Sequence, residues 1–487
     1  MLFNSVVFIT VFLPLALLGW YLLQQLKNPG YAKIFLIGMS FWFYGYYNVS
    51  YLWILIASLA MNYLLSILME HGRTLPVRRG LLLIGIFGNL GLLFYFKYFN
   101  FFLDNCNFFF HTDFSVEKIA LPLGISFFTF QQLSFVIERY RGGASHYPLL
   151  DYCLFISFFP QLIAGPIVLH SELIPQIQAR KNRIPSWELF YDGITLFVLG
   201  LGKKVLLADI LAVTVNAEFG NIAALDAPCA WIVIFMYMME LYFDFSGYCD
   251  MARGIGYMFG FRLPENFDSP FHATSVKEFW RRWHMTLSRF LTQYIYIPLG
   301  GNRRGKARQC VNLFLVFLIS GLWHGANWTF VVWGIMHGLA LVFETLFPKL
   351  RFKQEWLNRL KTAIFVTLSF SIFRSDSLAD AALLWRRLFA GGLKDFFPAL
   401  CNTLRIPENY ALIKLTEMVY PKGLNLLFCG NMILLLLVSV ILIQGKKAEE
   451  WLAEKGKTRS GTACMAFLFL WAFISLSQVS VFLYFNF

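Results

Sequence analysis

The stretch Phe279–Trp328 reads FWRRWHMTLSRFLTQYIYIPLGGNRRGKARQCVNLFLVFLISGLWHGANW and holds two histidines in different settings. The first, His284, recurs with Trp280 and Leu287 at helical spacing, so we expect it on the apolar face of an amphipathic helix. The second, His324, ends an apolar run. An ionisable side chain there is costly in a bilayer and is a functional candidate by default. The stretch therefore predicts a membrane helix that ends in a reactive group.

The composition of the whole chain indicates a multi-spanning membrane protein. Of its 487 residues, 58% are hydrophobic and 14% are charged, whereas a soluble domain carries about 25% charged residues. Long apolar runs recur along the chain. We therefore predict an all-α polytopic protein, a single integral domain over residues 1–487 with roughly 11–13 membrane helices or re-entrant segments. Pro160, Gly165 and Pro166 interrupt the run 150–169 and, with Pro175 after it, indicate a re-entrant segment beside a cavity.

Basic residues give the chain a formal net charge of +13. They cluster in short loops between apolar runs, namely Arg73–Arg79, Arg303–Arg308 and Lys446–Arg459. The tendency of such loops to stay in the cytoplasm accounts for them without a polyanionic ligand, so we expect no nucleic-acid partner. The same tendency puts the first and last of these loops in the cytoplasm and the acidic loop 104–118 outside. We therefore expect membrane lipid to be the main partner of the protein surface.

Outside the opening stretch the sequence offers few groups for chemistry. Glu240 and Asp244 stand four residues apart on one helical face, either as acid–base groups or as structural partners of an arginine or of loop backbone. His337, on the next apolar run, is a further candidate. Neither an HExxH motif nor a cysteine–histidine cluster occurs, so we expect no bound metal. The connection 375–426 is the least apolar, which predicts an interfacial amphipathic helix or, alternatively, a docking site for a soluble partner.

Several motifs in a fixed order resemble one protein family. They are FFPQLIAGPI at 158–167, YFDFSGYCDMARGIG at 242–256, and then FWRRWH, IPLGGNRRG and LWHGANW within the opening stretch. This set is similar to the membrane-bound O-acyltransferase family, most of all to the bacterial branch with the membrane subunits of alginate and peptidoglycan O-acetylation. The resemblance covers most of the chain, with its motif core at 242–328. It implies helices arranged around a central funnel.

The resemblance implies a role for both histidines. His324 matches the histidine regarded as catalytic in this family, and His284 matches a position often described as a second active-site residue. A neutral imidazole, with a pKa of about 6.5, can take the proton from an attacking hydroxyl at neutral pH. For each histidine the alternative is a core residue that a hydrogen-bond partner satisfies. Gly321 and Gly325 are expected to leave room for substrate beside His324.

Other side chains are expected to contact the substrates. They are Trp323 and Trp328 beside the acyl group, Asp244 and Ser246 on the acceptor side, and Arg303 and Arg304 around the phosphates of an anionic donor. For the two arginines the alternative is a signal that only sets the orientation in the membrane.

The resemblance also implies a function. The protein is expected to pass an acetyl group from a cytosolic thioester, with acetyl-CoA as donor and no bound cofactor, across the bacterial cytoplasmic (inner) membrane. A periplasmic or extracellular SGNH-type transferase would then place it on a polysaccharide such as alginate or peptidoglycan, because this chain lacks a soluble domain for that step. One alternative is a D-alanyl transfer subunit for teichoic acid that uses a carrier-protein thioester. Another is a non-catalytic transporter or flippase, which the lack of an internal sequence repeat disfavours.

Overall fold

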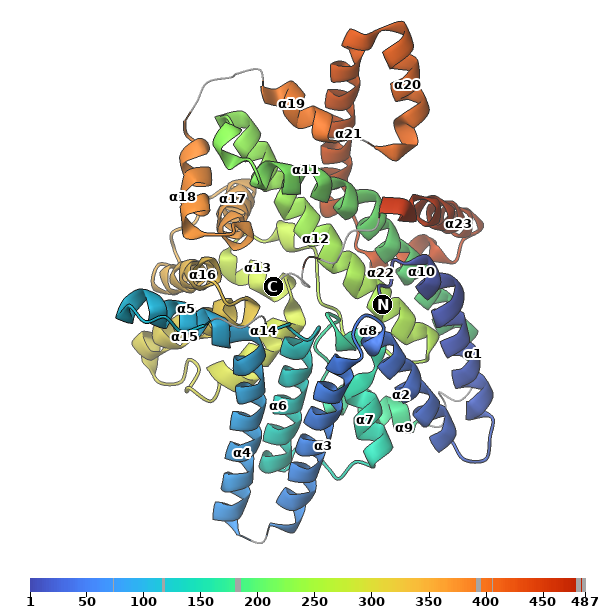
Figure 1. Cartoon of the computed structure of the whole chain (residues 1–487), viewed down its shortest axis with the longest axis vertical. Helices are drawn as coiled ribbons and strands as arrows, with labels where there is room; N and C mark the ends of the chain where they lie inside the picture. Colours follow the sequence, from blue (N-terminus) through green and yellow to red (C-terminus); the bar gives the residue numbers. More distant parts are fainter. Residues whose placement is uncertain are drawn as a thin grey trace. The chain divides into compact units, whose positions relative to one another are not determined.

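The computed structural model shows a helical protein. Throughout the described residues its regular structure is helical, except for one isolated antiparallel bridge between Phe267 and Trp283 (Figure 1). The prediction of an all-α fold is confirmed. The structure describes residues 1–72, 74–115, 119–179, 185–390, 396–404, 406–478 and 483.

Packing divides the chain into two compact units, each made from two segments. Helices α10 and α12 contribute to both units, because the boundaries fall within them. The expectation of a single integral domain with a central funnel stays a prediction. The first unit is Met1–Phe197 with Cys249–Glu265, and the second is Val198–Tyr248 with Asn266–Phe487.

In the first unit, α3, α4 and α6 pack against one another (Figure 1). Asn62 of α3 and Asn89 of α4 exchange side-chain amide hydrogen bonds of 3.1 and 2.7 Å. Polar pairs of this kind hold membrane helices together. The helices are α1 (Leu13–Gln24), α2 (Gly30–Gly45), α3 (Ser50–His71), α4 (Leu75–Leu93), α5 (Phe99–Phe110), α6 (Ile125–Arg141), α7 (Leu149–Ser157), α8 (Phe159–Leu162), α9 (His170–Gln178) and most of α10 (Trp187–Lys203).

The run 150–169 is broken near the prolines and glycine that interrupt it. Helix α7 ends before Phe158, α8 is only four residues long, and α9 begins after the run. A Cβ on Gly165 would lie 2.6 Å from the Pro160 carbonyl oxygen, so the chain folds back this tightly only with glycine there. The break is confirmed, whereas the re-entrant path and its cavity stay predictions.

The second unit contains the stretch with both candidate histidines. Its closest helix pair is α15 and α16, where a Cβ on Gly334 would lie 2.5 Å from the Phe317 carbonyl oxygen. Small residues let two membrane helices approach in this way. The helices are α11 (Asp209–Phe219), α12 (Ala227–Met258, shared), α13 (Val276–Arg282), α14 (Met285–Leu291), α15 (Gly305–His324), α16 (Trp328–Leu346), α17 (Glu355–Arg374), α18 (Leu378–Arg387), α19 (Phe396–Thr403), α20 (Tyr410–Val419), α21 (Leu424–Gln444), α22 (Ala448–Trp451) and α23 (Arg459–Ile474).

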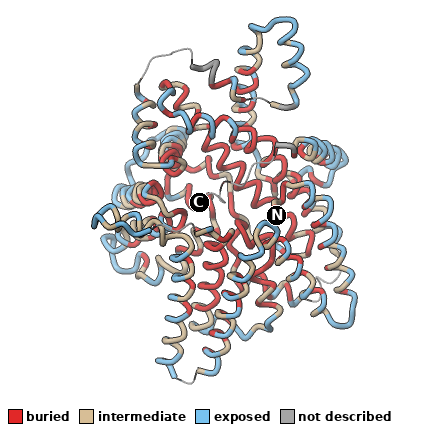
Figure 2. Tube along the Cα trace, in the orientation of Figure 1, coloured by how far each residue is buried: buried red, intermediate tan, exposed pale blue. Residues whose placement is uncertain are grey.

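Among the described residues, five helical segments are long and apolar enough to cross a membrane. They are Ser50–His71, Leu75–Phe110, Ala227–Met258, Trp328–Leu346 and Pro421–Gln444. The multi-pass prediction is confirmed. The number of roughly 11–13 segments and the orientation stay predictions, because other apolar runs form shorter or interrupted helices. Helix α12 is the most buried of the five. In its most apolar stretch 83% of the residues are buried, compared with 17% to 44% in the other four segments (Figure 2).

The connection 375–426 contains α18, α19 and α20. Helix α18 is amphipathic, since Ala381 and Leu384 are buried while Arg386 is exposed. The predicted amphipathic helix is therefore present, and its place at the membrane interface stays a prediction. Residues 391–395 of this connection lie outside the described residues.

Candidate active site

His324 is the last residue of α15, as the apolar run predicted. The helix ends because Gly325 takes an extended conformation, with φ −164° and ψ 156°. Asn327 then caps α16 by accepting a hydrogen bond from the backbone N–H of Thr329 (3.1 Å). This turn leaves the side chain of His324 inside the protein, only 4% exposed.

Aromatic rings surround His324 on several sides. Its ring centroid lies 5.0 Å from that of Trp323, 5.2 Å from Trp333 and 5.2 Å from Phe373. The Trp333 and Phe373 rings meet it edge to face. Walls of this kind exclude water, and they strengthen any hydrogen bond or charge that forms beside the imidazole.

The two glycines near His324 serve helix packing. A Cβ on Gly321 would lie 2.4 Å from the Phe330 carbonyl oxygen, and one on Gly325 would lie 2.1 Å from the Phe330 ring. The expectation that these glycines leave room for substrate is wrong, because α16 fills the space beside both.

His284 lies at a break between two short helices. Helix α13 ends before Trp283 and α14 begins at Met285, while His284 itself has a left-handed φ of 46°. The prediction of a continuous amphipathic helix is wrong here, for a non-local reason. Trp283 pairs with Phe267 in the antiparallel bridge, and the Met285 N–H donates to the carbonyl of Asn266 (3.0 Å). These bonds replace those of a helix and turn the histidine out of helical register.

A hydrogen bond to Asn266 defines the state of His284. The ring is fully buried, and its Nδ1 lies 3.1 Å from Asn266 Oδ1. An amide oxygen can only accept, so Nδ1 carries a hydrogen and, in the neutral ring, Nε2 carries the lone pair. His284 lies outside the five candidate spans, and burial lowers its pKa to about 3. The ring is therefore neutral at pH 7.

The structure brings the two candidate histidines together around one indole. The Trp323 ring lies 6.3 Å from the ring of His284 and 5.0 Å from that of His324. From the other side, Phe245 of α12 meets the His284 ring edge to face at 4.8 Å. We call His284, Trp323 and His324 the histidine pair site.

His337 is held by both of its ring nitrogens. The Trp280 Nε1–H donates to His337 Nδ1 (3.1 Å), which leaves the hydrogen on Nε2 to be donated to Ser369 Oγ (2.9 Å). The ring is fully buried and ties α13, α16 and α17 together. Its contacts are those of a structural brace.

Asp244 belongs to a buried ion cluster. Lys204 Nζ lies 2.6 Å from Asp244 Oδ1 and 2.8 Å from Asp209 Oδ1, and the Leu483 N–H donates to Asp244 Oδ2 (2.9 Å). The cationic partner of Asp244 is thus a lysine and not the arginine considered from the sequence, whereas the backbone partner considered there is present as the Leu483 N–H. Sequence reasoning missed Lys204, although a lysine within the apolar run 187–212 is the signal that marks a paired or functional charge.

Three other buried polar groups on α12 have no hydrogen-bond partner among the described residues. They are Tyr237 Oη, Glu240 Oε2 and Ser246 Oγ. Phe245, which contacts His284, lies between Asp244 and Ser246 in the chain. Helix α12 therefore reaches the histidine pair site through Phe245, while contacts of Asp244 and Ser246 with an acceptor stay predictions.

Three of the predicted contact residues are exposed. Trp328 begins α16 with 46% of its surface exposed, and Arg303 and Arg304 are exposed in the loop before α15. His324 ends that same helix of 20 residues, which spans about 30 Å at 1.5 Å per residue. The two arginines are therefore not brought to His324, and their contact with a donor stays a prediction.

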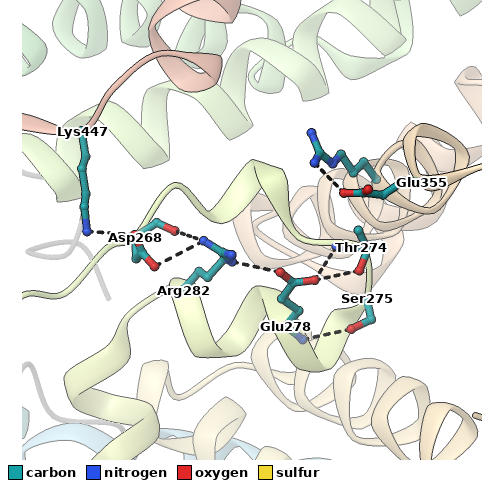
Figure 3. Close-up of polar contacts among 8 residues, drawn as sticks. Asp268, Thr274, Ser275, Glu278, Arg282, Glu355 and Lys447 are labelled. Atoms are coloured by element: carbon teal, nitrogen blue, oxygen red, sulfur yellow. Dashed lines mark hydrogen bonds and ion pairs between the residues drawn. The ribbon is translucent and has the colours of Figure 1, made fainter. Parts of the chain in front are cut away.

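An ion-pair chain runs along α13 and the loop before it (Figure 3). Arg282 pairs with Asp268 at 3.3 Å and with Glu278 at 3.1 Å, and Lys447 pairs with Asp268 at 3.0 Å. Glu278 also accepts a hydrogen bond from Thr274 Oγ1 (2.7 Å). Local spacing signals only the contacts of Glu278 with Arg282 and Thr274, because Asp268 and Lys447 are distant from them in sequence.

The arrangement at the histidine pair site suits acid–base chemistry among buried aromatic rings. It offers two imidazoles beside one indole, with aromatic walls that exclude water. Within the part of the chain that the structure describes, no group of three or more His, Cys, Asp or Glu residues is placed to hold a metal ion.

Comparison with known proteins gives consistent matches. The sequence model of the MBOAT, membrane-bound O-acyltransferase family, matches residues 111–374. A peptidoglycan O-acetyltransferase of Helicobacter pylori is 36% identical over 100% of this chain and 98% of its own length. A probable alginate O-acetylase AlgI of Pseudomonas putida is 40% identical over 80% of this chain and 81% of its own. A teichoic acid D-alanyltransferase of Bacillus subtilis is 30% identical over 51% of this chain and 65% of its own.

Proposed function

The chain belongs to the membrane-bound O-acyltransferase family, and from this premise we propose that it transfers an acetyl group from a cytosolic thioester for O-acetylation of an extracytoplasmic polysaccharide. The observation that carries the proposal is the histidine pair site, where His284 and His324 each lie beside Trp323. Similarity to a peptidoglycan O-acetyltransferase over the full length supports acetyl as the group transferred.

In this proposal His324 is the general base. It takes the proton from an attacking hydroxyl while the oxygen bonds to the thioester carbonyl carbon, and the carbon–sulfur bond then breaks. The proton passes to the leaving sulfur, so that a free thiol and an ester result. A positioned general base contributes about 10²- to 10⁴-fold to such a rate. The aromatic walls at Trp323 and Trp333 keep water from competing as the acceptor.

His284 has a supporting role in this proposal. Its Nδ1–H is committed to Asn266, so Nε2 is the nitrogen that accepts a hydrogen bond from a substrate group and orients it. A ring whose pKa is lowered to about 3 by burial is a poor proton acceptor at neutral pH. In this proposal proton transfer belongs to His324, which matches the family's catalytic histidine, and orientation belongs to His284.

On the acceptor side we propose Ser246 as a contact residue. Its buried hydroxyl has no hydrogen-bond partner among the described residues and lies next to Phe245, which touches His284. In this proposal Asp244 supports the same stretch of α12 and does not bind the acceptor directly, because its carboxylate is already bound to Lys204. Trp328, the first residue of α16, lies beside the acyl group in this proposal.

On the donor side we propose acetyl-CoA as the substrate. Arg303 and Arg304 attract its phosphates, since clustered guanidinium groups pair well with phosphate. They lie at the opposite end of α15 from His324, about 30 Å along the helix, so they act in capture of the donor and not on the reacting carbonyl.

The proposed setting is the bacterial cytoplasmic membrane. An SGNH-type transferase outside it receives the acetyl group and places it on alginate, peptidoglycan or a similar polysaccharide. D-alanyl transfer to teichoic acid is the second candidate, supported by 30% identity over about half of the chain. Membership of an acyltransferase family favours both over a transporter without covalent chemistry.

Thioester consumption by the purified protein tests this proposal. The protein is placed in lipid vesicles with acetyl-CoA and a polysaccharide fragment that supplies the acceptor hydroxyl, and release of free coenzyme A thiol is measured beside His324→Gln at the same protein level. We expect release above the vesicle background for the wild type and background release for the variant. Equal release by both proteins, or turnover of a D-alanyl carrier thioester but not of acetyl-CoA, would contradict it.

A further inference from the structure

We propose that Asn266 is a positioning residue that fixes the tautomer of His284 and thereby selects the nitrogen that His284 presents to substrate. This inference rests on the proposed function for its catalytic meaning, and on hydrogen-bond geometry for the tautomer itself. Asn266 appears in none of the sequence motifs discussed above, and it lies 18 positions before the histidine that it contacts.

The identity of the contacting atom follows from three donors. Asn266 Oδ1 lies 3.1 Å from His284 Nδ1, 3.1 Å from the Thr286 backbone nitrogen and 2.9 Å from Thr286 Oγ1. A backbone N–H can only donate, so the atom facing it must be the amide oxygen and not the amide nitrogen. An oxygen in that place accepts from His284 as well. The hydrogen of the neutral ring is therefore on Nδ1.

The two chain segments that carry Asn266 and His284 are held together by backbone hydrogen bonds and by ion pairs. The Asp268 N–H donates to the Arg282 carbonyl (2.9 Å) beside the Phe267–Trp283 bridge. The Arg282 guanidinium bonds the carbonyl oxygen of Asp268 (3.1 Å) and pairs with its carboxylate, which Lys447 also contacts (Figure 3). Asn266 thus meets the ring from a rigid support, as a positioning group requires.

The ring itself has little freedom to turn over. His284 is fully buried, Phe245 meets it edge to face at 4.8 Å, and Trp323 lies against it at 6.3 Å. Its backbone is held at φ 46°, a left-handed conformation that is uncommon outside glycine. A flip of the ring would exchange the two nitrogens and remove the hydrogen bond to Asn266. The bond therefore selects one orientation of the ring, with the hydrogen on Nδ1 and the lone pair on Nε2.

Paired substitutions separate this role from general support of the fold. Asn266→Leu keeps the approximate shape and removes the acceptor, whereas Asn266→Asp keeps an oxygen acceptor at the same place. Asp268→Asn is the matched control, because it weakens the same support without touching the His284 ring. Each variant is purified in lipid and compared at equal amounts of folded protein.

Nitrogen-15 NMR of histidine-labelled protein reads the tautomer without turnover. The His284 signals are identified as those missing from His284→Gln among the 8 histidines of the chain. We expect Nδ1–H in the wild type, Asp268→Asn and Asn266→Asp, and loss of that signature in Asn266→Leu. An Nε2–H signature in the wild type would overturn the inference, whether or not the protein turns over acetyl-CoA.

Kinetics then test the catalytic meaning. Loss of a partner that orients a histidine costs about 10- to 100-fold in activity, so we expect Asn266→Leu to lower kcat by that factor with little change in donor KM. Asn266→Asp should recover most of the rate. In the His284→Gln background Asn266→Leu should cost nothing further, because both changes remove one function. A full additional loss in that background would mean that Asn266 acts elsewhere. A wild type without acetyl transfer would instead refute the proposed function alone.

Discussion

His337 and the two histidines of the histidine pair site are all buried, yet their surroundings differ. His337 accepts from Trp280 at one nitrogen and donates to Ser369 at the other, so its bonding capacity is filled by neighbouring helices. His284 commits Nδ1 to Asn266 and meets aromatic rings elsewhere, and His324 is walled by Trp323, Trp333 and Phe373. Burial alone therefore does not identify a catalytic histidine. His337 is held by hydrogen bonds at both ring nitrogens, whereas the histidine pair site is set among aromatic rings, with a hydrogen bond from His284 to Asn266.

The largest effect is expected at His324. In His324→Gln the proposed general base is lost, which removes about 10²- to 10⁴-fold of the transfer rate. Donor binding should persist, because the substituted side chain keeps its polar character and nearly its length. Equilibrium binding of labelled acetyl-CoA to vesicles that contain the variant checks this. Loss of donor binding together with the rate would mean that His324 holds the donor and does not act as a base.

A smaller effect is expected at His284. His284→Gln should lower acetyl transfer by about 10- to 100-fold, since orientation of a substrate group is lost while the base remains. The rate is measured with saturating donor, in parallel with unfolding to correct for folded protein. A rate below that of His324→Gln would exchange the roles of the two histidines.

A few-fold effect on donor capture is expected at the basic loop. An exposed ion pair contributes about 0.2–1 kcal/mol, so replacing Arg303 and Arg304 by Gln should raise donor KM by up to about fivefold each. The increase should be greater at low salt, where screening is weaker. Steady-state kinetics at two ionic strengths provide the check, with unchanged kcat as the internal control. An unchanged KM in correctly inserted protein would leave these arginines as an orientation signal only.

The smallest effect on rate is expected at His337. His337→Ala leaves the Trp280 N–H and the Ser369 hydroxyl without their partner, at a cost of about 1–3 kcal/mol in stability for a buried polar group. Acetyl transfer per folded molecule should stay close to the wild type. Thermal unfolding in detergent and transfer rate are measured on one preparation. A large loss of rate at unchanged stability would remove the distinction between the brace and the histidine pair site.

Sequence patterns predicted the parts of this site that depend on local structure. An apolar run followed by Gly325 was enough to place His324 at the end of a helix. The prediction of a continuous helix through His284 was wrong. The local spacing is helical, but Trp283 pairs with Phe267, and no local pattern contains that contact. The charges at Lys204 and Asp268 have partners distant in sequence, so their pairing appears only in the fold.

Gly321 is a second case in which a local sequence pattern does not determine the surrounding structure. Gly321 stands next to a candidate catalytic residue, and a sequence motif alone suggests space for substrate. In the fold the space belongs to α16, whose Phe330 carbonyl would lie 2.4 Å from an added Cβ. Whether a glycine opens a cavity or admits another helix depends on the neighbouring element, which the local sequence does not specify.

The most direct test of the account compares acetyl transfer by His324→Gln and His337→Gln at matched amounts of folded protein in lipid. Both substitutions remove a buried imidazole, so a general effect of losing one would appear in both. We expect His337→Gln to keep most of the wild-type rate and His324→Gln to fall by at least about a hundredfold, as loss of a general base requires. If His324→Gln keeps more than about a tenth of the wild-type rate, the loss is smaller than a general base supplies, and the central assignment is wrong.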